Sequence, residues 1–336
     1  MDVRGEPMTY DPAAIRTPYK DGRLLVGPSR EPGRFDGLFV DCPFVCSDGG
    51  EYLMTYVGFD GTGYQTALSR SKDLESWSPG EVILARDPDH PYRRYNAALT
   101  SIVRDDRLGS DGQVTWLDGR AVGTYHAYPE PGMEAGAAII GFCVSDDLRT
   151  WRDTGSVLHP RDGGAWERGG LYKSWLMRYG GLYYCFYNAK NRTYDGWREQ
   201  IGYAVSPDLE HWERPRETPV VPNGGPGAFD ERFASDPCVL RDGDWWVMFY
   251  FGLSFDGRAR EGFAVSRDLL TWEKSDEILV DVGPPGSVDD TYAHKPAVVS
   301  RDGRLHHFYT AVRRVEPYQV GEHTLVERRG ISVARS

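Results

Sequence analysis

The heptapeptide Ser71-Lys72-Asp73-Leu74-Glu75-Ser76-Trp77 carries the pattern Ser-x-Asp-Leu-x-x-Trp, which decides the fold because it recurs along the chain. Later copies run from Ser145 to Trp151, from Ser206 to Trp212 and from Ser266 to Trp272, about 60 to 74 residues apart. Self-similarity at a nearly fixed spacing is the signature of a repeat architecture. We interpret the motif as structural, with Ser and Asp bonding turn amides and Leu and Trp packing between neighbouring repeats.

Each copy follows a short apolar strand, and two more strands joined by a Gly-containing turn lie upstream of it. Turns such as Asp242-Gly243 and Asp302-Gly303 between apolar runs are typical of hairpins. A fourth short strand follows each tryptophan. The repeat therefore predicts four-stranded antiparallel sheets, and a last copy of the apolar strand, Gly330 to Ala334, brings their number to five.

The fifth unit lacks a fourth strand at its C-terminal end, but a matching segment, Leu24 to Val26, lies near the N-terminus. Pairing this segment with the last unit removes an open sheet edge. The sequence thus predicts an all-β, five-bladed β-propeller with four-stranded blades. Residues 1–336 are expected to form a single catalytic domain, with 1–20 as an N-terminal extension and an insertion from Asp105 to Gly112 in the second blade.

Composition excludes several classes of function. The net charge is −11 and no run of Lys or Arg is present, which argues against nucleic-acid binding. The N-terminus has no signal-peptide core and no apolar stretch reaches the length of a membrane span, so we expect a cytoplasmic protein without membrane association. The cysteines show no CxxC spacing, which favours buried thiols over a metal site.

The innermost strand of every propeller blade faces one central funnel, so five segments distant in sequence are expected to meet there. The start of each predicted inner strand carries a polar or ionisable residue before an apolar run, and ionisable groups in buried strands are costly unless paired or functional. These residues are Asp41, Asn96, Lys173, Asp236, His294 and Lys295. Their equivalent positions predict a functional pocket, although any single member could instead tie blades together.

The five blades, Asp41-Cys42-Pro43 and Asp236-Pro237 at inner-strand starts, and the repeated motif together resemble the glycoside hydrolase family 43 superfamily, with relatives in families 32, 62, 117 and 130. The resemblance covers the chain after its first twenty residues. It implies an exo-acting, inverting glycosidase that removes a terminal sugar from an oligosaccharide, either furanosidase- or xylosidase-like or acting on an anionic sugar. It implies no required cofactor, although some family members carry a central divalent cation such as calcium.

Glycoside hydrolysis needs one ionised and one protonated group on either side of the scissile bond. The resemblance matches Asp41 to the family's base and Asp236 to an inner-strand Asp-Pro, but no inner strand begins with the Glu that serves as acid. Candidates for the acid are Asp236, His294, which resembles a blade-five His of family 117, and Glu231 or Glu167 from loops before blades four and three.

Substrate contacts are expected from basic and aromatic residues near the same pocket. The predicted substrate-binding residues are Asn96, Lys173, Lys295, Arg94, Glu167, Trp166 and Tyr172. The cations could pair with the catalytic carboxylates and lower their pKa values, or they could hold a uronate, a sulfate or a free phosphate. The aromatic rings could stack on sugar faces or pack the ends of blades.

Two alternatives to a glycosidase stay open. The missing inner-strand Glu allows a non-catalytic carbohydrate-binding propeller, and the resemblance to family 130 allows a glycoside phosphorylase. Turnover of glycosides, and its dependence on added phosphate, would separate these alternatives. The sequence leaves the sugar, its anomeric configuration and the oligomeric state open.

Overall fold

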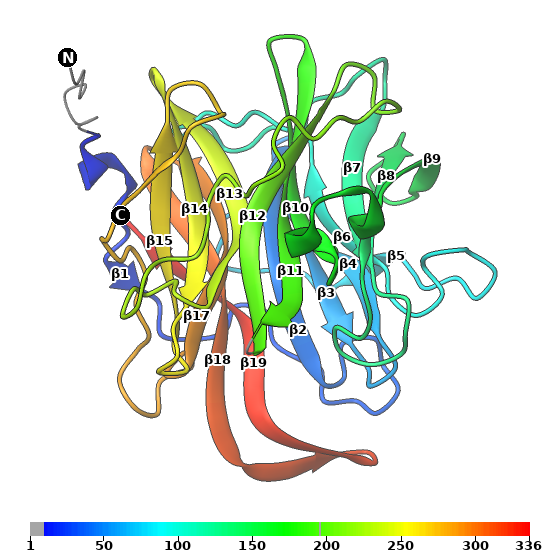
Figure 1. The fold of residues 1–336 in the computed structure, drawn as a ribbon. Coiled ribbons are helices and arrows are strands. Elements are labelled where there is room, and N and C mark those ends of the chain that lie inside the picture. Colours follow the sequence, from blue (N-terminus) through cyan, green and yellow to red (C-terminus); the bar gives the residue numbers. More distant parts are fainter. Residues whose placement is uncertain (1–9, 195) are drawn as a thin grey trace.

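The computed structural model describes residues 10–194 and 196–336, and these form strands and loops with three short 3-10 helices (Figure 1). The helices are η1 (Pro12–Ile15), η2 (Pro160–Asp162) and η3 (Ala165–Glu167). No helix in this part of the chain is long and apolar enough to cross a membrane. The predicted all-β class is confirmed.

Two four-stranded antiparallel sheets come first along the chain. The first contains β2 (Phe39–Asp48), β3 (Glu51–Phe59), β4 (Tyr64–Ser71) and β5 (Glu81–Leu84). The second contains β6 (Ala98–Ile102), β7 (Ala121–Ala127), β8 (Ile139–Ser145) and β9 (Arg152–Leu158). Each follows the meander order that the repeat predicts.

The remaining strands form one eleven-stranded sheet, in which single parallel pairs join three antiparallel groups. The first group is β10 (Leu171–Tyr179), β11 (Leu182–Tyr194) and β12 (Gly196–Ser206). The second is β13 (Phe233–Asp242), β14 (Trp245–Leu253), β15 (Ala259–Ser266) and β16 (Glu273–Lys274). The third is β17 (Tyr292–Arg301), β18 (Arg304–Val320), β19 (His323–Arg335) and β1 (Tyr19–Lys20). The described residues therefore give successive antiparallel meanders, an arrangement typical of a propeller-like fold.

An N-terminal segment completes the last group, as predicted. Val26 pairs antiparallel with Ile331 of β19, and Lys20 in β1 pairs with Ala334 farther along the same strand. The pairing begins earlier in the chain than expected, because β1 lies within the segment predicted to be an extension. This strand covers the edge of β19 that would otherwise expose unpaired N–H and C=O groups.

The repeated motif forms the same turn at all four sites. Ser71 Oγ accepts the N–H groups of Asp73 and the following leucine, and Asp73 Oδ1 accepts those of the next two residues. The tryptophans pack across to neighbouring groups; for example, the rings of Trp212 and Phe142 are stacked with centroids 4.3 Å apart. The motif thus both ends a strand and joins adjacent sheets, which explains its recurrence.

A loop that follows β6 crosses the molecule at the far ends of the inner strands. This floor segment (residues 103–117) hydrogen-bonds to Ser47 near the end of β2, to Arg241 in β13 and to Ser300 in β17. It contains the predicted insertion, which does more than lengthen a hairpin. Because the inner strands begin at the opposite end of the funnel, the floor segment lies across the closed end of the central channel.

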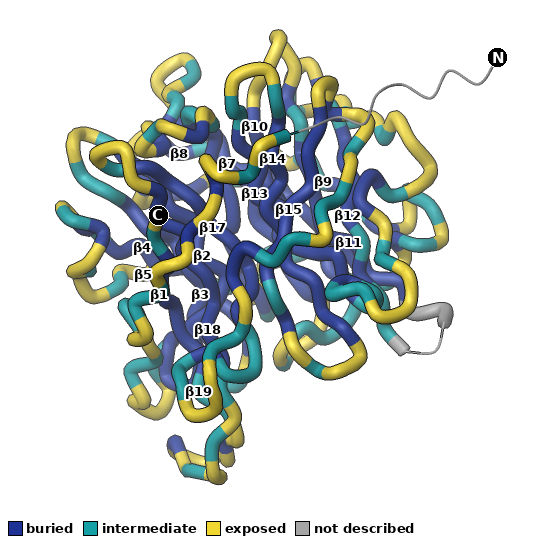
Figure 2. Tube along the Cα trace, turned by 90° about the vertical axis from the view of Figure 1, so that its left-hand side faces the viewer, coloured by how far each residue is buried: buried dark blue, intermediate teal, exposed yellow. Residues whose placement is uncertain are grey.

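Arg104 anchors the floor segment at the centre of the fold. Its guanidinium group lies over the Trp175 ring at 4.8 Å and donates to the backbone carbonyls of Val45 and Val298. The strands are largely buried, and exposed residues lie mainly in the loops at the periphery (Figure 2). A cation held by carbonyls and an aromatic face is well accommodated in such an interior.

Asp106 lies beside Arg104 in the floor segment, and this carboxyl group makes folding stability depend on pH. Burial raises the pKa of Asp106 from 3.8 to about 7, although Arg104 opposes the shift. The folded state therefore holds this proton more tightly than the unfolded state, so the stabilisation is complete below about pH 4 and is lost as the pH rises through 7. Asp106→Asn should reduce the fall in unfolding free energy between pH 5 and 8 by roughly 2 to 4 kcal/mol.

Urea denaturation at both pH values would measure this difference. Asp302→Asn is the matched control, because the side chain of Asp302 is 86% exposed at the same end of the molecule. An unchanged pH dependence in Asp106→Asn would show that the buried carboxyl does not carry the effect.

Candidate active site

The inner strands β2, β6, β10, β13 and β17 each contain a β-bulge near their start. The register breaks lie between Asp41 and Phe44, Leu99 and Ser101, Tyr172 and Ser174, Ser235 and Cys238, and His294 and Ala297. At four of these bulges a non-glycine residue has a positive φ: Cys42 (53°), Lys173 (32°), Asp236 (58°) and Lys295 (68°). Each residue held in such a conformation costs about 1 to 3 kcal/mol of stability, and these conformations are common at functional sites.

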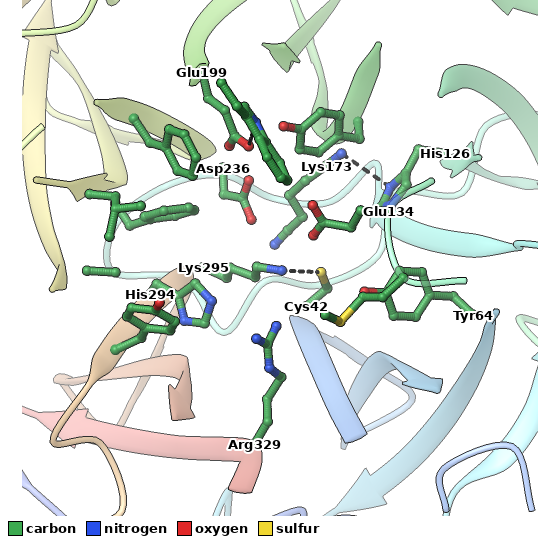
Figure 3. A pocket seen from close by; sticks show the side chains of 18 of the residues that line it. Cys42, Tyr64, His126, Glu134, Lys173, Glu199, Asp236, His294, Lys295 and Arg329 are labelled. Carbon is green, nitrogen blue, oxygen red and sulfur yellow. Dashed lines mark hydrogen bonds between the residues drawn. The ribbon is translucent and has the colours of Figure 1, made fainter. Parts of the chain in front are cut away.

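The bulged side chains line one central pocket of about 200 Å³ (Figure 3). Its wall includes His126 and Glu134 from the second sheet and its loop, Glu199 from β12 and Arg329 from β19. A pocket this size is smaller than the roughly 300 to 1,000 Å³ typical of drug-sized ligands. It therefore has room for one small ring at its inner end. Of the predicted site residues, Lys173, Asp236, His294, Lys295 and Tyr172 line this pocket.

Asp236 and Glu199 form a carboxyl pair that is bridged by two shared donors, Asn188 and Ser235. Asn188 Nδ2 donates to Glu199 Oε2 at 2.9 Å and to Asp236 Oδ1 at 3.1 Å. Ser235 Oγ lies 2.7 Å from the same Glu199 oxygen and 3.0 Å from Asp236 Oδ1, but it has a single proton to give. Glu199 also accepts Trp197 Nε1, so it has the donors that an ionised carboxylate needs.

Asp236 has the opposite environment. Its Oδ2 atom is buried and has no hydrogen-bond partner among the described residues. Burial raises the pKa of Asp236 to about 6 and Glu199 adds to the rise, although Lys295 and Lys173 oppose it. The pair thus holds a protonatable carboxyl group, Asp236, beside a carboxylate with several donors, and both residues line the pocket.

Asp41 lies behind the pocket wall, and this position gives little support to its predicted role as the base. The residue is 1% exposed, and its Oδ2 accepts Lys295 Nζ at 2.9 Å and Arg329 Nη1 at 2.6 Å. Its Oδ1 accepts the Thr310 hydroxyl and the Cys42 N–H. Burial opposes ionisation, yet the two cations hold the pKa of Asp41 well below its ordinary value. A carboxylate with four donors is suited to anchoring Lys295 and Arg329 rather than to removing a proton.

The two histidines of the pocket are suited to hydrogen bonding as neutral rings. Burial lowers the pKa of His294 to about 3, and its Nδ1 lies 2.9 Å from the Thr310 carbonyl and so carries the proton. Nε2 of His294 is then an acceptor, which argues against the predicted role of acid. His126 is the reverse case: its Nδ1 accepts the Lys173 N–H at 3.2 Å, so Nε2 is the donor. Burial also lowers the pKa of His126 to about 3.

Glu134 is a pocket carboxylate that the sequence analysis missed. It lies on the loop after β7, and its Oε2 accepts Lys190 Nζ at 2.9 Å. Lys190 is fully buried and lies over the rings of Tyr172 at 4.3 Å and Trp197 at 3.9 Å. Although burial opposes ionisation, Lys190 and then Lys295 lower the pKa of Glu134 to about 2. Glu134 is therefore an ionised group on the pocket wall, and Figure 3 shows it facing Asp236 across Lys173 and Lys295.

Besides Asp41, five predicted site residues lie outside the pocket lining. Asn96 accepts the Tyr64 N–H and donates to the carbonyls of Tyr128 and Glu130, so it holds the loop that carries Glu134. The others have different partners. Glu167 pairs with Arg214 and Tyr187, Trp166 donates to the Glu217 carbonyl, Glu231 accepts two loop amides, and Arg94 lies over Tyr95. Each of these residues has a partner that gives it a structural role, and their predicted roles at the site stay predictions.

The missed residues gave a weak signal in the sequence. Glu199 belongs to the third strand of its group and Glu134 to a loop, so neither falls at an inner-strand start. Lys190 is ionisable within the buried strand β11, and this position could have indicated a charged partner nearby. Among the described residues no group of three His, Cys, Asp or Glu side chains could hold a metal ion. The ammonium groups of Lys173 and Lys295 also make the pocket a poor site for the implied divalent cation.

Comparisons with known proteins place this pocket in context. The sequence model of the Glycosyl hydrolases family 32 N-terminal domain matches residues 120–284. A 1,2-beta-oligomannan phosphorylase from Thermoanaerobacter sp. (strain X514) is 29% identical over 129 residues, 37% of this chain and 43% of that protein. An uncharacterized protein from Mycobacterium tuberculosis (strain CDC 1551 / Oshkosh) is 29% identical over 167 residues, 47% of this chain and 52% of that protein. The chain thus spans about half the length of these curated relatives.

Solved structures cover nearly the whole chain. The structure of a complex of BT0996 with RGII has a TM-score of 0.80 and 28% identity over 96% of this protein and 92% of that one. A beta-1,2-mannobiose phosphorylase from Listeria innocua has a TM-score of 0.66 over 95% and 96%, but at 12% identity it shows the fold alone.

The fold, the carboxyl-lined pocket and these matches indicate a propeller-type, glycoside hydrolase-like protein. Within that class, the chain is similar to the superfamily that has relatives in glycoside hydrolase families 32 and 130. The resemblance drawn from the repeat is confirmed at this level. The narrower likeness to family 43 stays a prediction.

The contrast between Asp41 and Asp236 can be tested through stability. Asp41→Asn leaves Lys295 and Arg329 buried without that carboxylate, and removing one partner of a buried ion pair typically costs about 3 to 5 kcal/mol. Asp236→Asn is the matched control, because no cation lies within ion-pair distance of this carboxyl among the described residues. We expect thermal unfolding at pH 5.5 to show a large loss for Asp41→Asn and at most about 1 kcal/mol for Asp236→Asn. Equal stability of the two variants would contradict the anchoring role of Asp41.

Proposed function

We propose that this protein is an exo-acting glycosidase that cleaves the terminal glycosidic bond of an oligosaccharide with inversion at the anomeric carbon. The antiparallel groups would be five blades of one catalytic propeller domain. The observation that carries the proposal is the carboxyl group of Asp236, a pocket-lining residue whose buried Oδ2 atom has no hydrogen-bond partner among the described residues. A carboxyl group with a pKa of about 6 holds a proton often enough at mildly acidic pH to donate it.

In the proposed reaction, Asp236 gives its proton to the glycosidic oxygen while the bond between that oxygen and the anomeric carbon breaks. A water molecule attacks the anomeric carbon from the opposite side and passes a proton to Glu134. Burial and the neighbouring Glu199 raise the pKa of Asp236, and Lys190 lowers the pKa of Glu134. Separate acid and base groups on opposite walls, with space for water between them, are the requirement for inversion.

Exo action is supported by the shape of the site. The pocket of about 200 Å³ is small, and the floor segment crosses the far ends of the inner strands. An oligosaccharide could enter such a pocket by one end but could not pass through it. The terminal sugar would therefore occupy the inner end, and the rest of the oligosaccharide would remain at the mouth.

A glycoside phosphorylase is the second candidate. Lys173, Lys295 and Arg329 line the inner end of the pocket and could accept phosphate in place of the attacking water. A relative named as an oligomannan phosphorylase adds to this case, although it matches 37% of this chain. The two candidates share Asp236 as acid but differ in the nucleophile.

Activity assays would test the proposed roles. With a panel of oligosaccharides and aryl glycosides, Asp236→Asn and Glu134→Gln should each lower kcat/KM by about 10² to 10⁴-fold, the usual size of general acid or base catalysis. Because Asp236 must be protonated, the activity of the wild type should fall as the pH rises above about 6. Glu231→Gln is the control, since Glu231 is bonded to loop amides outside the pocket.

The outcomes separate the alternatives. Product formation only with added phosphate would favour the phosphorylase. Sugar binding without turnover of any substrate would favour a non-catalytic propeller. Full activity of Asp236→Asn would exclude Asp236 as the acid. Retention of configuration in the freshly released sugar, measured by NMR, would contradict the proposed inversion.

A further inference from the structure

Lys173 is a buried cation without a counter-ion at the inner end of the pocket. The residue is 2% exposed, and the one hydrogen bond of its Nζ atom goes to the Pro43 carbonyl at 3.3 Å. No carboxylate lies within ion-pair distance of it among the described residues, and an ammonium group has three donors to satisfy. Its backbone also has a positive φ of 32°. The fold thus accepts both strain and an uncompensated charge at this position.

The neighbouring cations have carboxylate partners, so among the described residues Lys173 is the cation of this group that lacks one. Lys295 pairs with Asp41, and Arg329 pairs with Asp41 and Glu327. Figure 3 shows these three side chains reaching the same central space from different sides. Cys42 also lies there, but burial raises the pKa of this thiol to about 12, so it adds no negative charge. Glu134 and Glu199 also belong to the wall, but Glu134 is bonded to Lys190, and Glu199 accepts donors from uncharged side chains. Neither carboxylate lies within ion-pair distance of Lys173 among the described residues.

Burying an unpaired charge costs several kcal/mol unless a partner compensates it. A bound anion would supply that partner, whereas the hydroxyl groups of a neutral sugar would bring no compensating charge. A carboxylate has two acceptor oxygens, which suits an ammonium group with two free donors beside a second ammonium group. The pocket volume limits this anion to a group carried on one sugar ring or to a small free ion.

We propose that the inner end of the pocket binds the carboxylate of a terminal acidic sugar, a uronic acid, through Lys173 and Lys295. The role of this sugar as the one released rests on the proposed function, but its binding does not. Recognition of the carboxylate would place the ring of the acidic sugar beside Asp236 and Glu134. Lys173 is then a specificity-determining residue, since it discriminates a uronic acid from the neutral hexose of the same configuration.

Isothermal titration calorimetry with free sugars tests this proposal without any need for turnover. At pH 5, where uronates are ionised and Asp236 is largely protonated, glucuronate or galacturonate should bind at least about tenfold more tightly than glucose or galactose. The preference should weaken as the pH rises through 6, because ionised Asp236 repels the ligand. Asp236→Asn should remove this pH dependence and keep the preference.

Substitutions at Lys173 give the sharper comparison. Lys173→Gln should abolish the preference for uronates by weakening their binding far more than that of neutral sugars, whereas Lys173→Arg should retain the preference. Lys72→Gln is the control, because Lys72 is exposed on the motif turn. Removing an unpaired buried charge should also raise the thermal midpoint of ligand-free Lys173→Gln, which shows that the variant folds.

Three results would overturn the proposal. Neutral sugars could bind as tightly as uronates, or Lys173→Gln could weaken both classes equally. Inorganic phosphate could bind with the same dependence on Lys173 while uronates do not, which would assign the site to a free anion. Failure of the proposed function is distinguishable: uronates would then bind with the predicted preference, yet no uronic acid would be released from any oligosaccharide.

Discussion

The strained backbone at the start of the inner strands is the constraint on which the site depends. In a regular strand, alternate side chains face the two sides of the sheet, so a run of inner residues cannot all point at the funnel. A bulge adds one residue and re-aims the side chain at that position. Here the bulges turn Cys42, Lys173, Asp236 and Lys295 inward. The same bulge recurs in several inner strands, and it brings a thiol, a carboxyl group and two ammonium groups into one small pocket.

Two aspartates on equivalent strands show how environment divides the roles of one residue type. Asp41 lies one position before its bulge and accepts four donors, two of them cationic. Asp236 lies on its bulge, keeps one oxygen unpartnered and shares its donors with Glu199. The first carboxylate stabilises the cations of the pocket, and the second remains available to a ligand. The charges and donors around each aspartate therefore give the two residues different roles.

The repeat made the all-β class and the closing pair of Val26 with Ile331 predictable, because turn bonds and strand periodicity are local. The site was predictable only in part. Lys173, Asp236 and Lys295 were found from polar residues at strand starts, but the bulge moved the inward position in β2 from Asp41 to Cys42. Glu134 and Glu199 come from a loop and a third strand, where only three-dimensional packing brings them to the pocket. The exact position of a bulge and the path of a loop depend on long-range contacts, and the spacing of residues in the sequence does not reveal these contacts.

The floor segment also constrains the order of events at the pocket. Because residues 103–117 cross the far ends of the inner strands, every molecule enters and leaves by the same opening. Under the proposed function, the sugar at the inner end would depart only after the part at the mouth had moved away, and a new molecule would enter only after both had gone. Released sugar and incoming oligosaccharide would therefore compete for a single passage. Accumulation of the released sugar would slow the protein through this geometry alone, without a second binding site.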